Sequence, residues 1–293
     1  MPFDRCMDRI TSGERLSADE IRDLAATPDI LSLGMLADAL RRRLHGTRVT
    51  FVRVAECPFD GAPAGHVPPS AREIQLTGAP GDLTAAVGAV EAARSVAAGR
   101  TIAAFAWDDI ERWSGSTPPA QVLAQLRSAG LDAIANVPLD GVKDVSGAVQ
   151  SLLGAGFSRL RLAVSKASAA ERIGLFLQAG ELQDEYGCLQ SLNPLPSTLA
   201  AFRPTTGYDD VKMVAIARLA APTIPSIQVD WRRYGPKLAQ VALTFGADDV
   251  DGVSGSDEAP EGRRRAPLEE IRRNIEAAGL IPVERDGRFS ALS

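Results

Sequence analysis

The sequence is poor in the residues that bind transition metals and form disulfides. It contains only three cysteines, Cys6, Cys57 and Cys188, and two histidines, His45 and His66. The cysteines form no C-x-x-C pair and predict no disulfide framework. Zinc sites are built mainly from cysteine and histidine ligands, and this sequence offers few of either. Cys57 and His66 could supply half of one, but a free loop thiol is the simpler interpretation, and we predict no metal.

Long apolar stretches are also missing. No run approaches the about 20 apolar residues that span a bilayer, and the N-terminal sequence MPFDRCMDRI has no apolar signal core. We therefore expect a cytoplasmic protein without a membrane partner. The net charge of −5 and the isoelectric point near 5.3 do not indicate a basic surface that would bind nucleic acid. The basic run RRR at 263–265 has glutamates on both sides and is interpreted as a solvated loop, whereas RRR at 41–43 suits the C-terminal turn of a predicted helix.

What the sequence does contain is an alternation of apolar and helical segments. Two helices come first, and helices with capping boxes or terminal glycines separate the later apolar runs. Eight strands alternating with helices predict the α/β class and a TIM-type (β/α) barrel. We expect an N-terminal helical extension over 1–46, the barrel over 47–253, and a flexible loop with a C-terminal helix packed on the barrel over 254–293. The runs typical of buried strands are residues 49–54, 73–76, 101–106, 133–137, 159–164, 188–192, 226–229 and 249–253.

The crossover between the first two predicted strands is unusual. A parallel crossover usually contains a helix, but residues 55–72 carry prolines at 58, 63, 68 and 69. Proline in a helix interior removes a hydrogen bond and clashes with the preceding turn, so these residues are incompatible with a regular helix. We therefore expect an irregular loop here and a barrel that lacks its first crossover helix.

Three blocks of the sequence resemble a known enzyme family. They are GERLSADEIRDLAATPDILSLGMLADALRRRLHGTRVTFV, AGLDAI, and LQDEYG followed by TTGYDDVKMVAIARLAAPTIPSIQVDWRRYGPKLAQVALTFGADDVDG. Together with the tail IEAAGLIPVERDGRF, they are similar to the radical S-adenosylmethionine (SAM) enzymes of the futalosine route to menaquinone. The aminofutalosine synthase branch is more similar than the dehypoxanthine futalosine cyclase branch. The resemblance implies a barrel whose mouth, at the carboxyl ends of the strands, binds a four-iron, four-sulfur cluster, SAM and substrate.

The chain departs from that family where the cluster should bind. The family's loop after the first strand carries C-x-x-x-C-x-x-C, whose three thiolates hold the cluster, whereas this loop reads AECPFDGAPAG and keeps only Cys57. The family's glycine-rich turn that approaches SAM is shortened here to LTGAPGDL and keeps Gly78. We therefore predict a degenerate family member that binds no cofactor, in which Cys57 and Gly78 are vestiges of the cofactor region.

Polar residues nevertheless remain at the ends of several predicted strands. An indole beside carboxylates and guanidiniums suits a carboxylated aromatic ligand, which it binds by stacking and bidentate hydrogen bonds. The alternative is that the acidic residues cap the helices that follow and the arginines form surface ion pairs. No catalytic residue is assigned. The ligand-binding candidates at the barrel mouth are Trp107, Asp108, Asn136, Asn193, Asp230, Trp231 and Arg232.

Three functions follow as hypotheses. The first is a cluster-less homologue of aminofutalosine synthase that serves menaquinone biosynthesis as a ligand-binding or partner subunit. Its ligand would be a small carboxylate or a nucleoside, and its partner a pathway enzyme or a second copy of the chain. The second is an enzyme with non-radical chemistry at the barrel mouth, and the third is an active radical SAM transferase. The missing cysteines favour the first.

Overall fold

The computed structural model describes residues 3–61, 67–115, 117–197, 205–262 and 264–292. His66 and the first arginine of the basic run, Arg263, lie outside the described residues. Internal contacts divide the chain into two compact units. The first comprises Met1–Thr50, Leu162–Val250 and Arg272–Val283, and the second comprises Phe51–Arg161, Asp251–Ile271 and Glu284–Ser293.

The chain has the α/β barrel fold that the alternation of apolar and helical segments predicted. Each of the eight predicted strands is confirmed, with boundaries that shift by a few residues. Neighbouring strands are parallel wherever their register is defined. No helix in the described parts of the chain is long and apolar enough to cross a bilayer. The strands are β1 (Arg48–Pro58), β2 (Glu73–Thr77), β3 (Thr101–Ala106), β4 (Ala133–Pro138), β5 (Leu160–Val164), β6 (Leu189–Pro194), β7 (Ser226–Asp230), β8 (Asp249–Ser254) and a short β9 (Ile281–Glu284).

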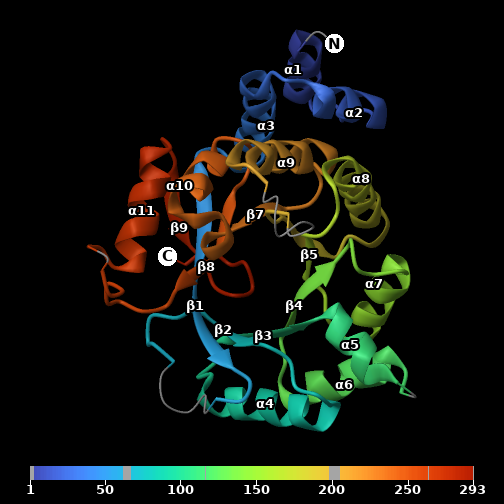
Figure 1. Cartoon of the computed structure of the whole chain (residues 1–293), viewed down its shortest axis with the longest axis vertical. Coiled ribbons are helices and arrows are strands. Elements are labelled where there is room, and N and C mark those ends of the chain that lie inside the picture. Colours follow the sequence, from blue (N-terminus) through green and yellow to red (C-terminus); the bar gives the residue numbers. More distant parts are fainter. Residues whose placement is uncertain (1–2, 62–66, 116, 198–204, 263, 293) are drawn as a thin grey trace. The chain divides into compact units, whose positions relative to one another are not determined.

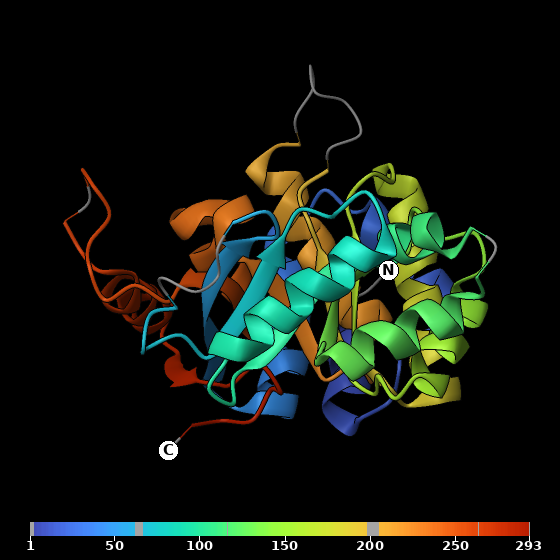
Figure 2. The same cartoon turned by 90° about the horizontal axis from the view of Figure 1, so that it is seen from below.

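The second unit is built on β1, β2, β3 and β4, which lie side by side in that order. Its helices are α4 (Leu83–Val96), α5 (Trp107–Ser114), α6 (Pro119–Ala129) and α7 (Val145–Gly154). Helix α4 packs along β2 and β3, and the two views in Figures 1 and 2 show it beside these strands. Between β1 and β2 the described residues form turns and bends without a helix, as the prolines predicted.

The first unit contains the N-terminal helices α1 (Phe3–Ser12), α2 (Ala18–Ala26) and α3 (Ile30–His45), followed by α8 (Ala169–Tyr186), α9 (Gly207–Ala220) and α10 (Trp231–Leu243). Helix α9 packs against α2, α3 and α8 and is buried along most of its length (Figure 1). Capping boxes begin α2 at Ser17 and α8 at Ser168, as their sequences predicted. Helix α11 (Pro267–Ala277) confirms the predicted C-terminal helix.

A buried polar cluster joins α3, α9 and the start of β8 in the first unit. The guanidinium of Arg218 donates to the carboxylate of Asp248, which also accepts from the backbone N–H of Ile227 at 2.8 Å. The Nε2 atom of His45 lies 3.5 Å from Asp248 Oδ2. Burial lowers the pKa of His45 and raises the pKa of Asp248, because removal from water disfavours each charged form.

Candidate ligand-binding site

The carboxyl ends of β3 and β4 bring together two of the predicted site residues in the second unit. Ala106, the last residue of β3, is the register partner of Asn136 in β4. Trp107 follows directly as the first residue of α5. In α/β barrels the carboxyl ends of the strands and the loops that follow them carry the functional site. Trp107 and Asn136 therefore occupy the functional end of neighbouring strands.

Both of these residues carry a buried polar atom without a hydrogen-bond partner. Trp107 is 3% exposed, and its Nε1 finds no acceptor among the described residues. The Oδ1 atom of Asn136 is likewise buried and finds no donor. The great majority of buried polar groups in folded proteins are paired, so each unpaired one needs an explanation. One donor and one acceptor at adjacent strand ends suit a polar ligand that supplies the two missing partners.

The two acidic residues that follow Trp107 have different roles. Asp109 caps α5, since its Oδ2 accepts from the N–H of Ala106 at 2.9 Å and its Oδ1 accepts from Arg112 at 2.8 Å. Asp108 is exposed and forms no hydrogen bond or ion pair with the described residues. Its carboxylate lies over Gly141, where an added Cβ would meet Asp108 Oδ1 at 3.5 Å. The capping alternative therefore applies to Asp109, and Asp108 stays available at this edge.

Phe105, which was not among the predicted site residues, is a strained residue next to this site. Its φ is +61°, a conformation that bulky side chains rarely adopt. Such strain costs roughly 1–3 kcal/mol and persists only where surrounding structure enforces it. Here the ring packs edge-on against Trp113 at 4.8 Å, and the Trp113 indole donates to the carbonyl of Pro80 at 3.1 Å. The anchored ring fixes the backbone just before Trp107.

In the first unit, the end of β6 carries a similar buried acceptor. Asn193 is 9% exposed, and its Oδ1 finds no partner among the residues that the structure describes. The backbone after it is held in place, because Arg172 donates to Leu195 O at 2.7 Å and the buried Tyr234 hydroxyl donates to Pro194 O. Burial raises the pKa of Tyr234, so this hydroxyl stays protonated as a donor.

The other first-unit candidates lie where β7 meets α10. Asp230 caps this helix, since its Oδ1 accepts from the N–H groups of Arg232 at 2.8 Å and Arg233 at 3.1 Å. The Nε atom of Arg232 lies 3.9 Å from the same carboxylate oxygen. Trp231 begins the helix and is largely buried. The capping alternative thus describes Asp230 in the structure, and a ligand contact by these residues stays a prediction.

The cysteines do not fit the cluster that the resemblance implies. A four-iron cluster with an open site for SAM needs three thiolates, but the only cysteine at the end of β1 is Cys57. Cys6 lies in α1, and Cys188 directly precedes β6. Burial raises the pKa of all three thiols, which disfavours the thiolate form that binds iron. Among the described residues, no group of three or more cysteine, histidine or acidic side chains could hold a metal ion.

The turn at Gly78 is occupied by a side chain of the chain itself. Gly78 has a φ of +74°. A Cβ added there would lie 3.0 Å from Cδ1 of the Phe59 ring. The phenyl ring from the loop after β1 therefore lies against this turn. Phe59, which was not among the predicted site residues, fills the space next to Gly78. A former role of Gly78 in cofactor binding stays a prediction.

Part of the chain matches a known family model. Residues 190–292, which include Asn193, Asp230 and Trp231, match the CofH/MqnC C-terminal region. Aminodeoxyfutalosine synthase of Thermus thermophilus is 28% identical over 358 aligned positions, which cover 96% of this chain and 94% of that protein. A 5-amino-6-(D-ribitylamino)uracil–L-tyrosine 4-hydroxyphenyl transferase of Archaeoglobus fulgidus is 38% identical over 134 residues, and these cover 41% of this chain and 39% of the transferase. The chain is thus a distant homologue of aminodeoxyfutalosine synthase with a CofH/MqnC-type C-terminal region.

Solved structures share the barrel fold. Methylornithine synthase (PylB) has a TM-score of 0.65 at 15% identity, with 94% of this chain and 97% of that chain covered. The FeFe-hydrogenase maturase HydG from Carboxydothermus hydrogenoformans has a TM-score of 0.66 at 14% identity, with 96% of this chain and 79% of that chain covered. At such low identity the likeness shows the fold alone, and that fold is the predicted α/β barrel.

Proposed function

We propose that this protein is a cluster-less homologue of aminodeoxyfutalosine synthase that binds a small polar ligand at the carboxyl ends of its barrel strands. It performs no radical chemistry and serves menaquinone biosynthesis as a ligand-binding or partner subunit. The observation that carries the ligand site is the pair of buried, unpartnered atoms Trp107 Nε1 and Asn136 Oδ1.

Several observations support the loss of the cluster. The chain has a single cysteine after its first strand, and the ring of Phe59 lies against Gly78. The alignment with the Thermus enzyme spans 358 positions, although this chain has 293 residues, so stretches of that enzyme have no counterpart here. The missing thiols belong to the loop after the first strand, where the resemblance places the family's cluster, while the strands and helices of the scaffold persist.

The polar groups favour a nucleoside-like ligand over a carboxylate. The unpaired carboxylate of Asp108 lies at the same edge as Trp107 and repels a second carboxylate, whereas it accepts readily from sugar hydroxyls. The indole N–H of Trp107 matches a ring nitrogen or carbonyl, and the Asn136 oxygen matches an amine or hydroxyl. The names of the two relatives describe a futalosine and a ribityl-substituted uracil, which are polar heterocycles of this kind.

Binding of adenosine, inosine and 4-hydroxybenzoate, measured by thermal shift and calorimetry, tests the ligand class. A ligand at about 100 times its dissociation constant stabilises the folded protein by about 2.7 kcal/mol, which gives a measurable rise in melting temperature. We expect a nucleoside to bind and the aromatic acid to bind more weakly. A protein that no nucleoside stabilises would contradict the proposed ligand.

Paired tryptophan variants test the site itself. Trp107→Phe removes a donor that has no protein partner, so the free protein is expected to lose only the stability that the smaller buried ring costs, and nucleoside binding is expected to weaken. Trp113→Phe is the matched control, because its indole already donates to Pro80 O. The control is expected to lose about 1 kcal/mol more stability than Trp107→Phe, because it also loses this hydrogen bond, and to lose no affinity. The reverse pattern would place the ligand elsewhere.

A further inference from the structure

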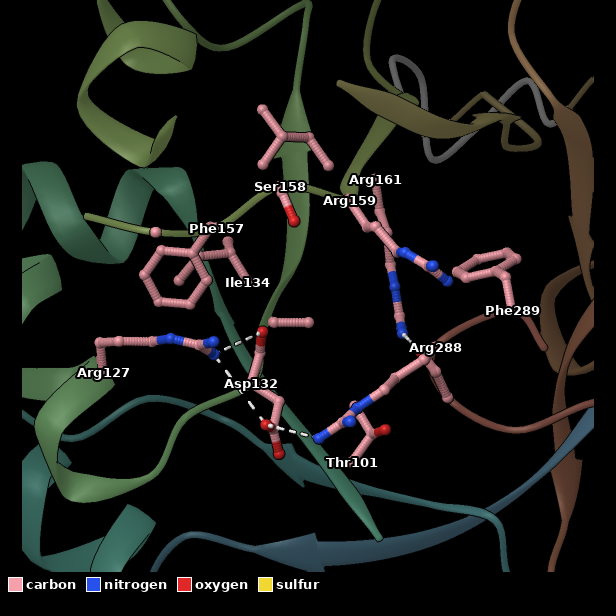
Figure 3. Close-up of a pocket in the computed structure, with 14 residues that line it drawn as sticks. Thr101, Arg127, Asp132, Ile134, Phe157, Ser158, Arg159, Arg161, Arg288 and Phe289 are labelled. Atoms are coloured by element: carbon pink, nitrogen blue, oxygen red, sulfur yellow. Dashed lines mark hydrogen bonds and ion pairs between the residues drawn. The ribbon is translucent and has the colours of Figure 1, made fainter. Parts of the chain in front are cut away.

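A cavity lies at the opposite ends of β3 and β4 from Trp107 and Asn136. In the second unit, the starts of β3, β4 and β5 and the C-terminal tail enclose a volume of about 250 Å³. Figure 3 shows its lining, in which arginine side chains face a single carboxylate. The polar lining residues are Thr101, Arg127, Asp132, Ser158, Arg159, Arg161 and Arg288.

The positive charge of this cavity exceeds its negative charge. Arg161 is neutralised by Glu73, to which it donates two hydrogen bonds of 2.8 and 2.7 Å. Two of the other three arginines face Asp132, whose Oδ1 lies 3.9 Å from Arg127 and 3.6 Å from Arg288. Figure 3 shows these two guanidiniums reaching Asp132 from opposite sides.

Two further observations show that this positive charge is not neutralised within the cavity. The second oxygen of Asp132 accepts from the backbone N–H of Ile102 at 3.0 Å, so this carboxylate is already engaged by the sheet. Arg159 is exposed and forms no ion pair with any described residue. Three guanidiniums against one partly engaged carboxylate leave the lining with two uncompensated positive charges.

The C-terminal tail is fitted closely to this cavity. Gly287 passes so near β2 and β3 that an added Cβ would lie 2.6 Å from both Glu73 Oε2 and Thr101 Cβ. Its carbonyl accepts from Arg161 at 2.9 Å. Phe289, with a strained φ of +62°, stacks under the guanidinium of Arg285 at 3.8 Å. These contacts hold the tail in one conformation and present Arg288 at the cavity wall.

We propose that this cavity binds a dianionic phosphate group, either free or on a small metabolite. Guanidiniums bind phosphate oxygens through paired, charge-assisted hydrogen bonds, and a dianion balances the two uncompensated charges. The hydroxyl groups of Thr101 and Ser158 also line the space and can donate to phosphate oxygens. Arg127 is held by the carbonyls of Leu131 and Asp132, and its guanidinium lies over Phe157, so Arg159 and Arg288 are the guanidiniums free to turn toward the ligand. The site is separate from the strand ends of the proposed function.

Titration calorimetry of the full chain with inorganic phosphate and with pyrophosphate, at constant ionic strength set by chloride, tests the proposal. Arg159→Gln and Arg288→Gln are each expected to weaken binding about tenfold or more, because each removes a charge-assisted hydrogen-bond donor. Both side chains are exposed, so the variants are expected to fold.

Arg264→Gln is the matched control, since it makes the same change of charge in the exposed basic run. It is expected to leave phosphate binding unchanged. Absence of binding above the chloride background would overturn the proposal. Equal weakening in the control and in the two cavity variants would also overturn it, because it would show diffuse attraction to net charge.

Discussion

The ion pair between Glu73 and Arg161 offers the sharpest stability prediction. Glu73 is 1% exposed and Arg161 5% exposed, and they form two hydrogen bonds of 2.8 and 2.7 Å across the second unit. A third bond from Arg161 reaches the carbonyl of Gly287. Glu73→Gln keeps the shape of the side chain but leaves the guanidinium buried without its counter-charge.

Breaking a buried ion pair by removing one partner typically costs 3–5 kcal/mol, because the remaining charge is uncompensated in a medium of low polarity. The glutamine oxygen can still accept one hydrogen bond, so the loss is expected at the lower end, about 3 kcal/mol. Urea unfolding followed by circular dichroism measures this loss as a lower midpoint with an unchanged slope.

The double variant Glu73→Gln with Arg161→Met removes the stranded charge. Since methionine fills similar space without a charge, the double variant is expected to regain at least about 1 kcal/mol relative to Glu73→Gln. A loss below about 1 kcal/mol in Glu73→Gln, or simple additivity in the double variant, would refute the claim that this pair is a coupled, buried unit.

Three further predictions concern other parts of the chain. Gly287→Ala is expected to lower the free energy of unfolding by about 1–3 kcal/mol, because the added Cβ has no room. Gly88→Ala is expected to raise it by roughly 0.5–1 kcal/mol, because the position in α4 has open space. Equal effects of the two variants in urea unfolding would contradict the tight fit at Gly287. Because burial lowers the pKa of His45, the unfolded chain binds a proton that the folded chain does not, so stability is full above the ordinary pKa of about 6.5 and falls as the pH drops below it. His45→Gln should remove this decline in unfolding measured between pH 7.5 and 5.5, and an unchanged decline would assign it to another group. Cys57 is buried and its pKa is raised, so it should react with iodoacetamide far more slowly in the folded protein than in urea. Mass spectrometry measures the labelling, and rapid labelling of the folded chain would mean an accessible thiolate.

The strands were predictable from sequence because strands buried on both faces read as continuous apolar runs. The run at 101–106, for example, coincides with β3. Helix α1 was not predicted, because its apolar stripe covers only ten residues and only Cys6 and Ile10 are buried. Capping boxes were the most reliable local signal, since Ser17 and Ser168 each start a helix through contacts within four residues.

The site was only partly predictable. Position at a strand end selected Trp107 and Asn136, but their lack of partners depends on how distant segments pack and has no local signature. The sequence offered capping as the alternative for the acidic residues, and this role falls to Asp109 and Asp230. The strained φ of Phe105 likewise follows from the ring's packing on Trp113 and could not be read from the strand pattern.

The cavity of Figure 3 could not be predicted at all. Its walls come from the end of α6, the starts of three strands and the C-terminal tail, which are far apart in the sequence. Arg159 reads as an ordinary strand-start residue, and Arg288 reads as part of a polar tail. Only the fold brings them to the same space.

The proposed function requires that the chain assembles no iron–sulfur cluster. Anaerobic incubation with iron, sulfide and a thiol reductant, followed by iron analysis, visible absorbance and electron paramagnetic resonance with SAM and dithionite, measures this directly. We expect no stoichiometric iron after desalting, no cluster signal and no cleavage of SAM. A four-iron cluster that cleaves SAM would contradict the proposed function and make the chain an active radical enzyme.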